Sequence, residues 1–173
     1  LSYLQELRLI TEENNIALIF DEVITGFRIG LGGCQEYFNI RADIVTYGKV
    51  IGGGLPIGIV AGKSKFLDAL DGGFWQYDDD SFPMVKSTFV AGTFCHHPLA
   101  MATSLKTLEI LNLSNGKLLH QLNSVTANFC DRMNAFFTEN GFKISIINFG
   151  SLFRFTAPGR YKQIYGQLLL NGV

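Results

Sequence analysis

The sequence has few of the features that mark disulfide-rich, nucleic-acid-binding or membrane-spanning proteins. It has three cysteines in 173 residues, widely spaced and without a CxxC pair, so we expect no disulfide framework and a reducing, cytoplasmic location. Lysine and arginine number 14 and aspartate and glutamate 15, without a basic stripe, which argues against a nucleic-acid-binding surface. The longest uncharged apolar stretch, residues 50–62, contains Pro56 and five glycines and is too short to cross a bilayer.

The start of the chain also lacks the marks of a natural N-terminus. The opening residues, LSYLQEL, contain no initiator methionine and no basic segment of the kind that begins a signal peptide, so we expect the chain to be a fragment. What the sequence does contain is apolar: 47% of its residues are hydrophobic, 17% are charged, and 15 are phenylalanines. This composition predicts a folded protein with a hydrophobic core or a large subunit interface.

Short apolar segments and glycine-rich loops alternate in the first half of the chain. Residues 16–20 form a continuous apolar run, which predicts a strand buried on both faces by helices, and the acidic pair Asp21-Glu22 follows it. In an open parallel α/β sheet, ligands bind at the carboxyl ends of the strands, where this pair would lie. The other predicted elements are a helix over residues 4–10, an irregular loop over 24–33, strands over 43–47 and 55–62, and a surface excursion over 72–87.

Two long helices and two strands are predicted in the second half. Pro98 suits the first turn of a helix, and apolar residues at i+3 spacing continue it. The order of elements indicates an α/β domain over residues 1–115 that leads into a smaller, truncated α+β domain over residues 116–173. The remaining signals are apolar residues at 118, 122, 125, 129, 133 and 136 for a second helix, Asn140-Gly141 as its stop, and strand-like runs over 142–147 and 152–156.

Lys49 stands out because of its neighbours. It follows a predicted strand and precedes a glycine-rich segment, VIGGG, so it has little side-chain bulk and no charge beside it. A lysine taken at random is a solvated surface group. In surroundings of this kind, however, the amine becomes a usable nucleophile toward a carbonyl carbon, and Schiff-base formation is its natural use.

Asp21 lies at the end of the predicted buried strand, where its carboxylate can face a ligand. A pyridoxal cofactor needs a carboxylate against its pyridine nitrogen, so that the ring stays protonated and can accept electrons. An isolated aspartate at such a place would more often only cap a turn. Neither Asp21 nor Lys49 decides the function alone.

The two residues belong to a longer pattern. Residues 18–28 are LIFDEVITGFR, residues 43–54 are DIVTYGKVIGGG, and Lys49 follows Asp21 by 28 residues. Together these segments resemble the cofactor signature of the class III aminotransferases. The resemblance implies a transferase of fold-type I that depends on pyridoxal 5′-phosphate. Residues 1–115 would then be the C-terminal part of its large, cofactor-binding domain, and residues 116–173 the start of its small domain.

The resemblance implies a role for each matching residue. Lys49 bonds covalently to the cofactor, Asp21 pairs with the pyridine nitrogen, and Val23 packs on a face of the ring. Residues 92–101, GTFCHHPLAM, are similar to a third family element, in which the pair Gly92 and Thr93 binds the cofactor phosphate from the partner subunit, which implies a homodimer. The family's phosphate loop and ring-stacking aromatic would lie upstream, so we expect this fragment alone to be inactive.

Within class III, residues 21–101 are most similar to the glutamate-1-semialdehyde aminomutase branch. The segment around residues 74–85 departs from it and resembles the aminotransferase domains of hybrid polyketide and nonribosomal peptide synthetases, such as the cyanobacterial microcystin and nodularin synthetases. That resemblance implies transamination of a β-keto acyl chain on a carrier protein, with an amino acid as the amino donor. Lys49 would move the proton as base and acid, while Asp21 would stabilise charge in the ring.

Other functions remain to be weighed. An intramolecular amino transfer, as in an aminomutase, uses the same residues, and a non-catalytic dimerisation scaffold is disfavoured only by the presence of both Lys49 and Asp21. A nucleotide-binding module fails, because neither GxGxxG nor GxxxxGK(S/T) occurs. We predict no metal site: the adjacent His96 and His97 cannot easily converge on one ion, and residues 78–80, DDD, suit a solvated acidic loop.

Overall fold

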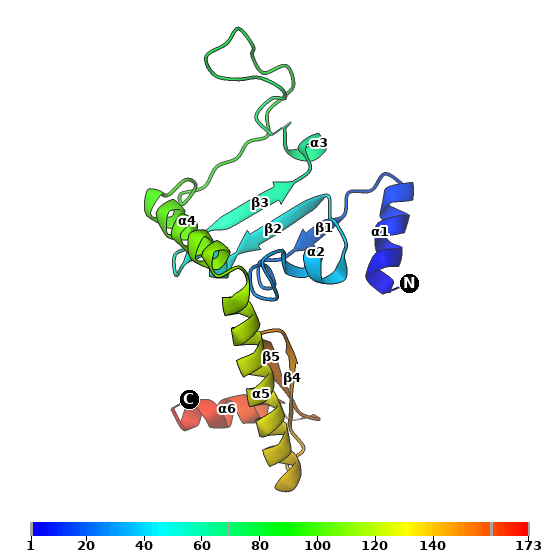
Figure 1. The fold of residues 1–173 in the computed structure, drawn as a ribbon, viewed down its shortest axis with the longest axis vertical. Helices are drawn as coiled ribbons and strands as arrows, with labels where there is room; N and C mark the ends of the chain where they lie inside the picture. The colour runs from blue at the N-terminus through cyan, green and yellow to red at the C-terminus, as the bar shows by residue number, and fades with distance from the viewer. Residues whose placement is uncertain (1, 69, 160, 173) are drawn as a thin grey trace. The chain divides into compact units, whose positions relative to one another are not determined.

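The computed structural model describes residues 2–68, 70–159 and 161–172 and divides into two compact units, Leu1–Gly116 and Lys117–Val173. Among the described residues, no helix has the length and apolarity needed to cross a membrane. The first unit contains α1 (Tyr3–Glu13), β1 (Ile19–Asp21), α2 (Gly33–Phe38), β2 (Ile44–Gly48), the 3₁₀ helix η1 (Lys49–Gly52), β3 (Gly58–Gly62), α3 (Ser64–Leu67) and α4 (Pro98–Leu113) (Figure 1). The second contains α5 (Lys117–Glu139), β4 (Ser145–Phe149), β5 (Leu152–Thr156) and α6 (Tyr161–Leu170).

A three-stranded sheet in the order β1-β2-β3 forms the centre of the first unit. β1 runs parallel to β2, with Ile19 beside Ile44 and Asp21 beside Thr46. The intervening residues 22–43 include α2, as expected because parallel neighbours need a long crossover. β2 and β3 are antiparallel, and only η1 and a short loop join them. The carboxyl ends of β1 and β2 therefore lie at the same edge of the sheet.

The first strand is shorter and less buried than the sequence predicted. It begins at Ile19, because the Leu18 amide donates to the Asp43 carboxylate instead (2.8 Å). The predicted burial on both faces is wrong for the described residues, since Ile19 is 56% exposed. Successive strand residues point to opposite faces, so Asp21 shares this open face, whereas Val45 on the other face is 4% exposed. The strands over 43–47 and 55–62 are confirmed as β2 and β3.

A buried carboxylate joins the elements at the opposite edge of the sheet. Asp43 precedes β2, and its carboxylate accepts from Arg8 Nη1 of α1 (2.8 Å), Lys63 Nζ after β3 (2.7 Å) and the Leu18 amide before β1 (2.8 Å). The hydrogen bond from Lys63, together with those from Leu18 and Arg8, holds the pKa of Asp43 well below its ordinary value, despite the opposing effect of burial. The sequence indicated none of these partners.

The loop predicted over residues 24–33 is a series of turns, but a helix that the sequence did not predict follows it. α2 begins at Gly33, whose φ is +62°, and ends at Phe38; the next residue, Asn39, has a left-handed φ of 52°. Asparagine tolerates this conformation better than most residues, so it can end a helix as glycine does.

The surface excursion predicted over residues 72–87 is confirmed and is longer than expected. Every residue from 76 to 99 is exposed. The excursion is closed at its base, where the amides of Met84 and Val85 both donate to the Gly72 carbonyl (2.9 and 3.1 Å). Within it, Trp75 packs edge-on against Tyr77, with ring centroids 4.6 Å apart. The excursion thus carries its own local order.

The second unit packs α5 against a hairpin of β4 and β5. The strands are antiparallel, with Ser145 opposite Thr156. Cys130, Phe137 and Ile146 form its buried cluster. Both predicted strands are confirmed, although β4 begins at Ser145 rather than 142. The chain first turns after α5, where Phe142 N donates to the Phe137 carbonyl (2.8 Å). The sequence did not predict α6.

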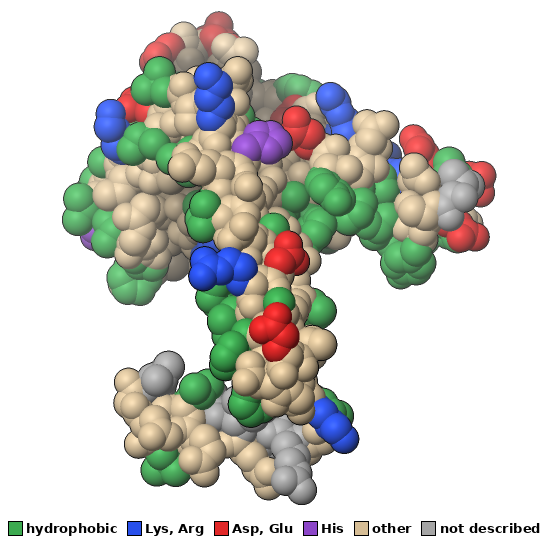
Figure 2. All heavy atoms as spheres, turned by 60° about the horizontal axis from the view of Figure 1, so that its bottom comes forward, with side chains coloured by type: hydrophobic (Ala, Val, Ile, Leu, Met, Phe, Trp, Pro, Cys, Tyr) green, Lys and Arg blue, Asp and Glu red, His purple; other side chains and the backbone are tan. Residues whose placement is uncertain are grey.

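The face that α5 buries lies one residue beyond most of the apolar positions in its sequence pattern. Phe136 of that pattern is 50% exposed, whereas Phe137 is 9% exposed. Asn140 and Gly141 end the helix as predicted, with Gly141 at φ +70°. Hydrophobic side chains lie at the surface in several places (Figure 2). On α5 the exposed large ones are Leu118, Leu122, Val125, Phe129 and Phe136.

Candidate active site

The two candidate chemical groups lie at one edge of the sheet. Asp21 is the last residue of β1, and Lys49 directly follows Gly48, the last residue of β2. Since the two strands are parallel, both residues are at the carboxyl edge, where open α/β sheets bind ligands. Both side chains are exposed there.

Asp21 is fixed in place by two hydrogen bonds to the same carboxylate oxygen. Its Oδ1 accepts from the amide of Val23 (3.1 Å) and from the hydroxyl of Thr46 (3.1 Å). Within the described part of the chain, Oδ2 accepts no hydrogen bond. The carboxylate is therefore oriented by one oxygen while the other is available to a ligand that carries an N–H.

Lys49 lies on a strained turn beside Val23. Its φ of +50° is left-handed, a conformation that residues other than glycine rarely adopt and that is found at functional sites. A side chain added at the preceding Gly48 would come within 3.4 Å of Val23 Cγ1, so Val23 lies next to the lysine turn. Lys49 forms no ion pair with any residue that the structure describes. Its amine is free for chemistry.

Helix α4 holds the turn that follows the lysine. Thr103 Oγ1 donates to the carbonyl of Gly52, the last residue of η1, at 2.9 Å. Gly53 follows with φ +59°, and a Cβ there would lie 2.6 Å from Thr107 Oγ1, so the absence of a side chain lets the helix approach closely. Within the glycine cluster, Gly53 is thus the residue whose lack of a side chain permits close packing against α4.

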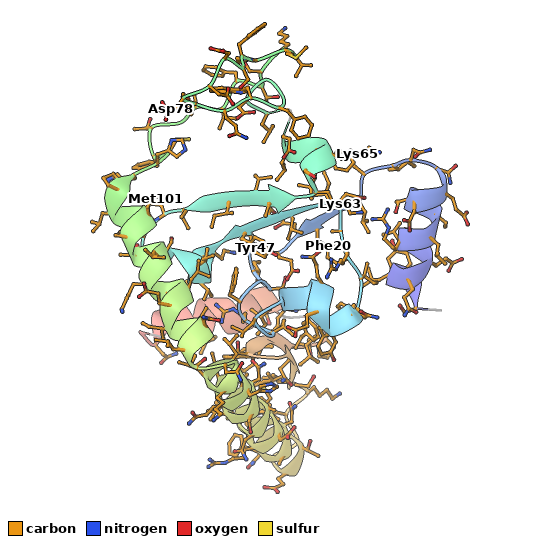
Figure 3. All side chains as sticks on the ribbon, turned by 45° about the horizontal axis from the view of Figure 1, so that its top comes forward. Phe20, Tyr47, Lys63, Lys65, Asp78 and Met101 are labelled. Atoms are coloured by element: carbon orange, nitrogen blue, oxygen red, sulfur yellow. The ribbon has the colours of Figure 1, made fainter. Side chains whose placement is uncertain are left out.

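Glu22 is a buried carboxylate to which the sequence assigned no role. It is 1% exposed, and Oε2 accepts from the amide of Cys34 (2.7 Å) and the hydroxyl of Thr25 (3.2 Å). Oε1 accepts from the amide of Gln35 (3.2 Å), so the carboxylate caps the first turn of α2. Burial, and then the charge of Glu22, raise the pKa of Tyr47, which is labelled on β2 in Figure 3. The Tyr47 hydroxyl accepts a hydrogen bond from Gln35 Nε2 of α2 (3.4 Å).

Gly92 and Thr93 form no hydrogen bond with the candidate groups in the described part of the chain. Both lie in the exposed segment before α4, and in the described residues no hydrogen bond links Thr93 to Asp21 or Lys49. His97 caps α4, because its Nδ1 accepts from the Ala100 amide (3.4 Å). The phosphate-binding role of Gly92 and Thr93 in a partner subunit stays a prediction.

A sequence model of the family described as "Aminotransferase class-III" matches residues 1–173, the whole chain. The chain belongs to the class III aminotransferases. Among the curated relatives of this chain is a "Glutamate-1-semialdehyde 2,1-aminomutase" of Sulfurisphaera tokodaii, 39% identical over 153 residues, which are 88% of this chain and 33% of the relative. The chain spans between 23% and 33% of the length of the curated relatives that it matches.

Solved structures agree with this membership. A "Transaminase with PLP bound" is 28% identical with a TM-score of 0.77, and the match covers 98% of this chain and 39% of that one. An omega-transaminase from Sphaerobacter thermophilus is 29% identical with a TM-score of 0.75, over 92% and 33% of the two chains. The family and its cofactor-bound neighbour indicate pyridoxal phosphate as the cofactor. The free Asp21 oxygen and the unpaired Lys49 amine fit it.

Proposed function

We propose that this chain supplies the lysine and the ring-nitrogen carboxylate of a pyridoxal-phosphate site for amino-group transfer. The observation that carries the proposal is the meeting of Asp21 and Lys49 at the carboxyl edge of two parallel strands, each free to bind a ligand. The bound cofactor would supply an aldehyde for covalent attachment and a ring that accepts electrons. Lys49 would hold it covalently and move the proton at the reacting carbon.

The other residues would orient the ring. Asp21 Oδ2 would accept a hydrogen bond from the protonated pyridine nitrogen, while Oδ1 keeps its hydrogen bonds from Val23 and Thr46. The Val23 side chain, beside the lysine turn, would pack on one face of the ring. Thr93 would bind the phosphate of the cofactor held by a second copy of the chain. A homodimer is therefore part of the proposal.

Covalent trapping tests the lysine assignment on the full chain. After incubation with limiting pyridoxal phosphate and borohydride reduction, peptide mapping should find the cofactor mainly on Lys49. Lys49→Ala should abolish that label, and Lys86→Ala, at an exposed lysine of the excursion, should not change it. Labelling spread evenly over the exposed lysines would contradict the assignment.

We further propose that the amino transfer is of the aminomutase type, within one substrate. This is supported by relatives named glutamate-1-semialdehyde 2,1-aminomutase, at 39% to 50% identity. An enzyme that contains this chain would then convert glutamate-1-semialdehyde without an added amino donor. Release of a keto acid from an added amino acid would instead indicate a transaminase.

The alternative substrate is a β-keto acyl chain on a carrier protein, with an amino acid as donor. Only the segment over residues 74–85 favours it, and the relatives reported above are named aminomutases and transaminases. Supplying the same enzyme with an amino donor and a β-keto acyl thioester tests it. Formation of a β-amino acyl product, without conversion of glutamate-1-semialdehyde, would identify the β-keto acyl chain as the substrate.

A further inference from the structure

In the part of the chain that the structure describes, the buried carboxylate of Glu22 has no cationic partner. Its three hydrogen-bond donors, the amides of Cys34 and Gln35 and the hydroxyl of Thr25, are all neutral. No lysine or arginine among the described residues pairs with it. Burying a carboxylate whose hydrogen-bond donors are all neutral costs free energy, so we expect Glu22 to have a specific role in the structure around it.

The residues that Glu22 holds form the loop immediately after Asp21. The Glu22 carbonyl accepts from the Gly26 amide (2.9 Å), and its amide donates to the Thr46 carbonyl (2.9 Å), which continues the strand pairing. The carboxylate accepts from Thr25 inside the same turn and from Cys34 in the first turn of α2. Gly33 is packed so closely that a Cβ there would overlap Glu22 Oε2. The loop is built around this one side chain.

The turn from Glu22 to Gly26 contains the donor that orients Asp21. Val23 lies inside this turn, and its amide donates to Asp21 Oδ1 (3.1 Å). Asp21 and Glu22 point to opposite faces of the strand, so Glu22 cannot touch a ligand that Asp21 binds. Any effect of Glu22 on such a ligand must pass through the turn.

We propose that Glu22 is a positioning residue: through the 22–26 turn it fixes the Val23 amide, which sets the direction of the Asp21 carboxylate toward the cofactor's ring nitrogen. The cofactor part of this inference rests on the proposed function, whereas the link from Glu22 to Asp21 does not.

Glu22→Gln keeps the shape of the side chain but removes one acceptor. Its amide nitrogen would face a backbone or hydroxyl donor, so one of the three donors is left unsatisfied. Hydrogen exchange on the full chain without cofactor should show faster exchange at the Val23 and Cys34 amides by about tenfold. Glu12→Gln, at an exposed glutamate of α1, is the matched control and should leave both amides unchanged.

A second experiment measures the binding of pyridoxal phosphate and of an analogue that differs only at the ring nitrogen. For Glu22→Gln, affinity for pyridoxal phosphate should fall about tenfold, as for Asp21→Asn. Affinity for the analogue with C–H in place of the ring nitrogen should be nearly unchanged. A residue that merely stabilises the fold would weaken both ligands alike, so the difference isolates the path through Asp21.

The outcomes separate the two proposals. Unchanged Val23 exchange in Glu22→Gln, or equal weakening of both ligands, overturns the positioning role, whatever Lys49 does. Faster exchange, with no pyridoxal phosphate bound by a wild-type enzyme that contains this chain, upholds the link between Glu22 and Asp21 and counts against the proposed function instead.

Discussion

At the scale of single residues, the two edges of the sheet use carboxylates in opposite ways. Asp43 at one edge is buried and meets two cations and an amide, while Asp21 at the other is exposed and keeps one oxygen free. Through these contacts the Asp43 carboxylate connects α1 to the strands. Removing its charge should therefore lower stability and leave the candidate site at the carboxyl edge of β1 and β2 intact.

We expect Asp43→Asn to lower the free energy of unfolding by about 2 to 3 kcal/mol, because Arg8 and the Leu18 amide lose a charged acceptor in a buried place. Lys63 is half exposed and contributes less. Urea unfolding of the full chain measures the change. Asp80→Asn, in the exposed excursion, should cost almost nothing.

The ion pairs of Asp43 also predict that stability falls in acid. The pKa of Asp43 is lowered in the folded chain, so its contribution is fully present above the ordinary aspartate pKa of about 3.9 and is lost as pH falls below that toward the folded value. The difference between wild type and Asp43→Asn should therefore shrink below about pH 4. A difference that stays constant down to pH 2 would contradict the lowered pKa.

Sequence reasoning singled out Asp21 and Lys49 because both stand at the ends of predicted strands, within segments that resemble the class III cofactor signature. It could not find the roles of Asp43 and Glu22. Their partners are distant in sequence, 35 residues away for Arg8 and 12 for Cys34, and no periodicity or motif connects them. Such pairings exist only once the strands and α2 are in place.

At the scale of elements, apolar periodicity located α5 but not the residues that it buries. The apolar positions of the sequence pattern and the residues that α5 buries lie on two neighbouring faces of the helix, because most of the buried positions come one residue later. Packing against β4 and β5 selects the face with Cys130 and Phe137. α2 was missed for a different reason: it is short, and a side chain outside it caps its first turn.

Neighbouring phenylalanines test which face of α5 is buried. Phe137→Ala should cost about 3 to 4 kcal/mol, because it empties part of the cluster with Cys130 and Ile146. Phe136→Ala should cost about 1 kcal/mol or less, since its ring is half exposed. Chemical denaturation, followed by a signal from the second unit, measures the free energy of unfolding of both variants. Equal losses would show that the buried face is assigned wrongly.

The contact between α4 and the lysine turn makes a separate prediction. Gly53→Ala should destabilise the first unit by about 2 kcal/mol, since the new Cβ meets Thr107 and a left-handed backbone. It should also speed hydrogen exchange across η1. Gly58→Ala, in β3 with open space around it, is the control and should cost little. A Gly53→Ala variant as stable as that control would count against close packing here.

At the scale of the whole molecule, the open face of the sheet and the exposed excursion matter most. Ile19 and Asp21 share the open face, and the residues of the excursion from 76 onward are exposed up to α4. The chain spans at most 33% of the curated relatives reported. A complete site would therefore draw on groups beyond those that the single chain brings together, and Thr93 is the one that this chain would offer to a second copy.

Subunit complementation tests that exchange in an enzyme that contains this chain. Lys49→Ala alone should be inactive, and Thr93→Ala should bind pyridoxal phosphate about tenfold more weakly because one phosphate donor is lost. If Thr93 serves the partner's site, each mixed dimer pairs an intact Lys49 with an intact Thr93 from the other copy. An equal mixture, refolded together at limiting cofactor, should then regain about a quarter of the wild-type activity. Recovery no greater than that of Thr93→Ala alone would place Thr93 in its own subunit's site or in none.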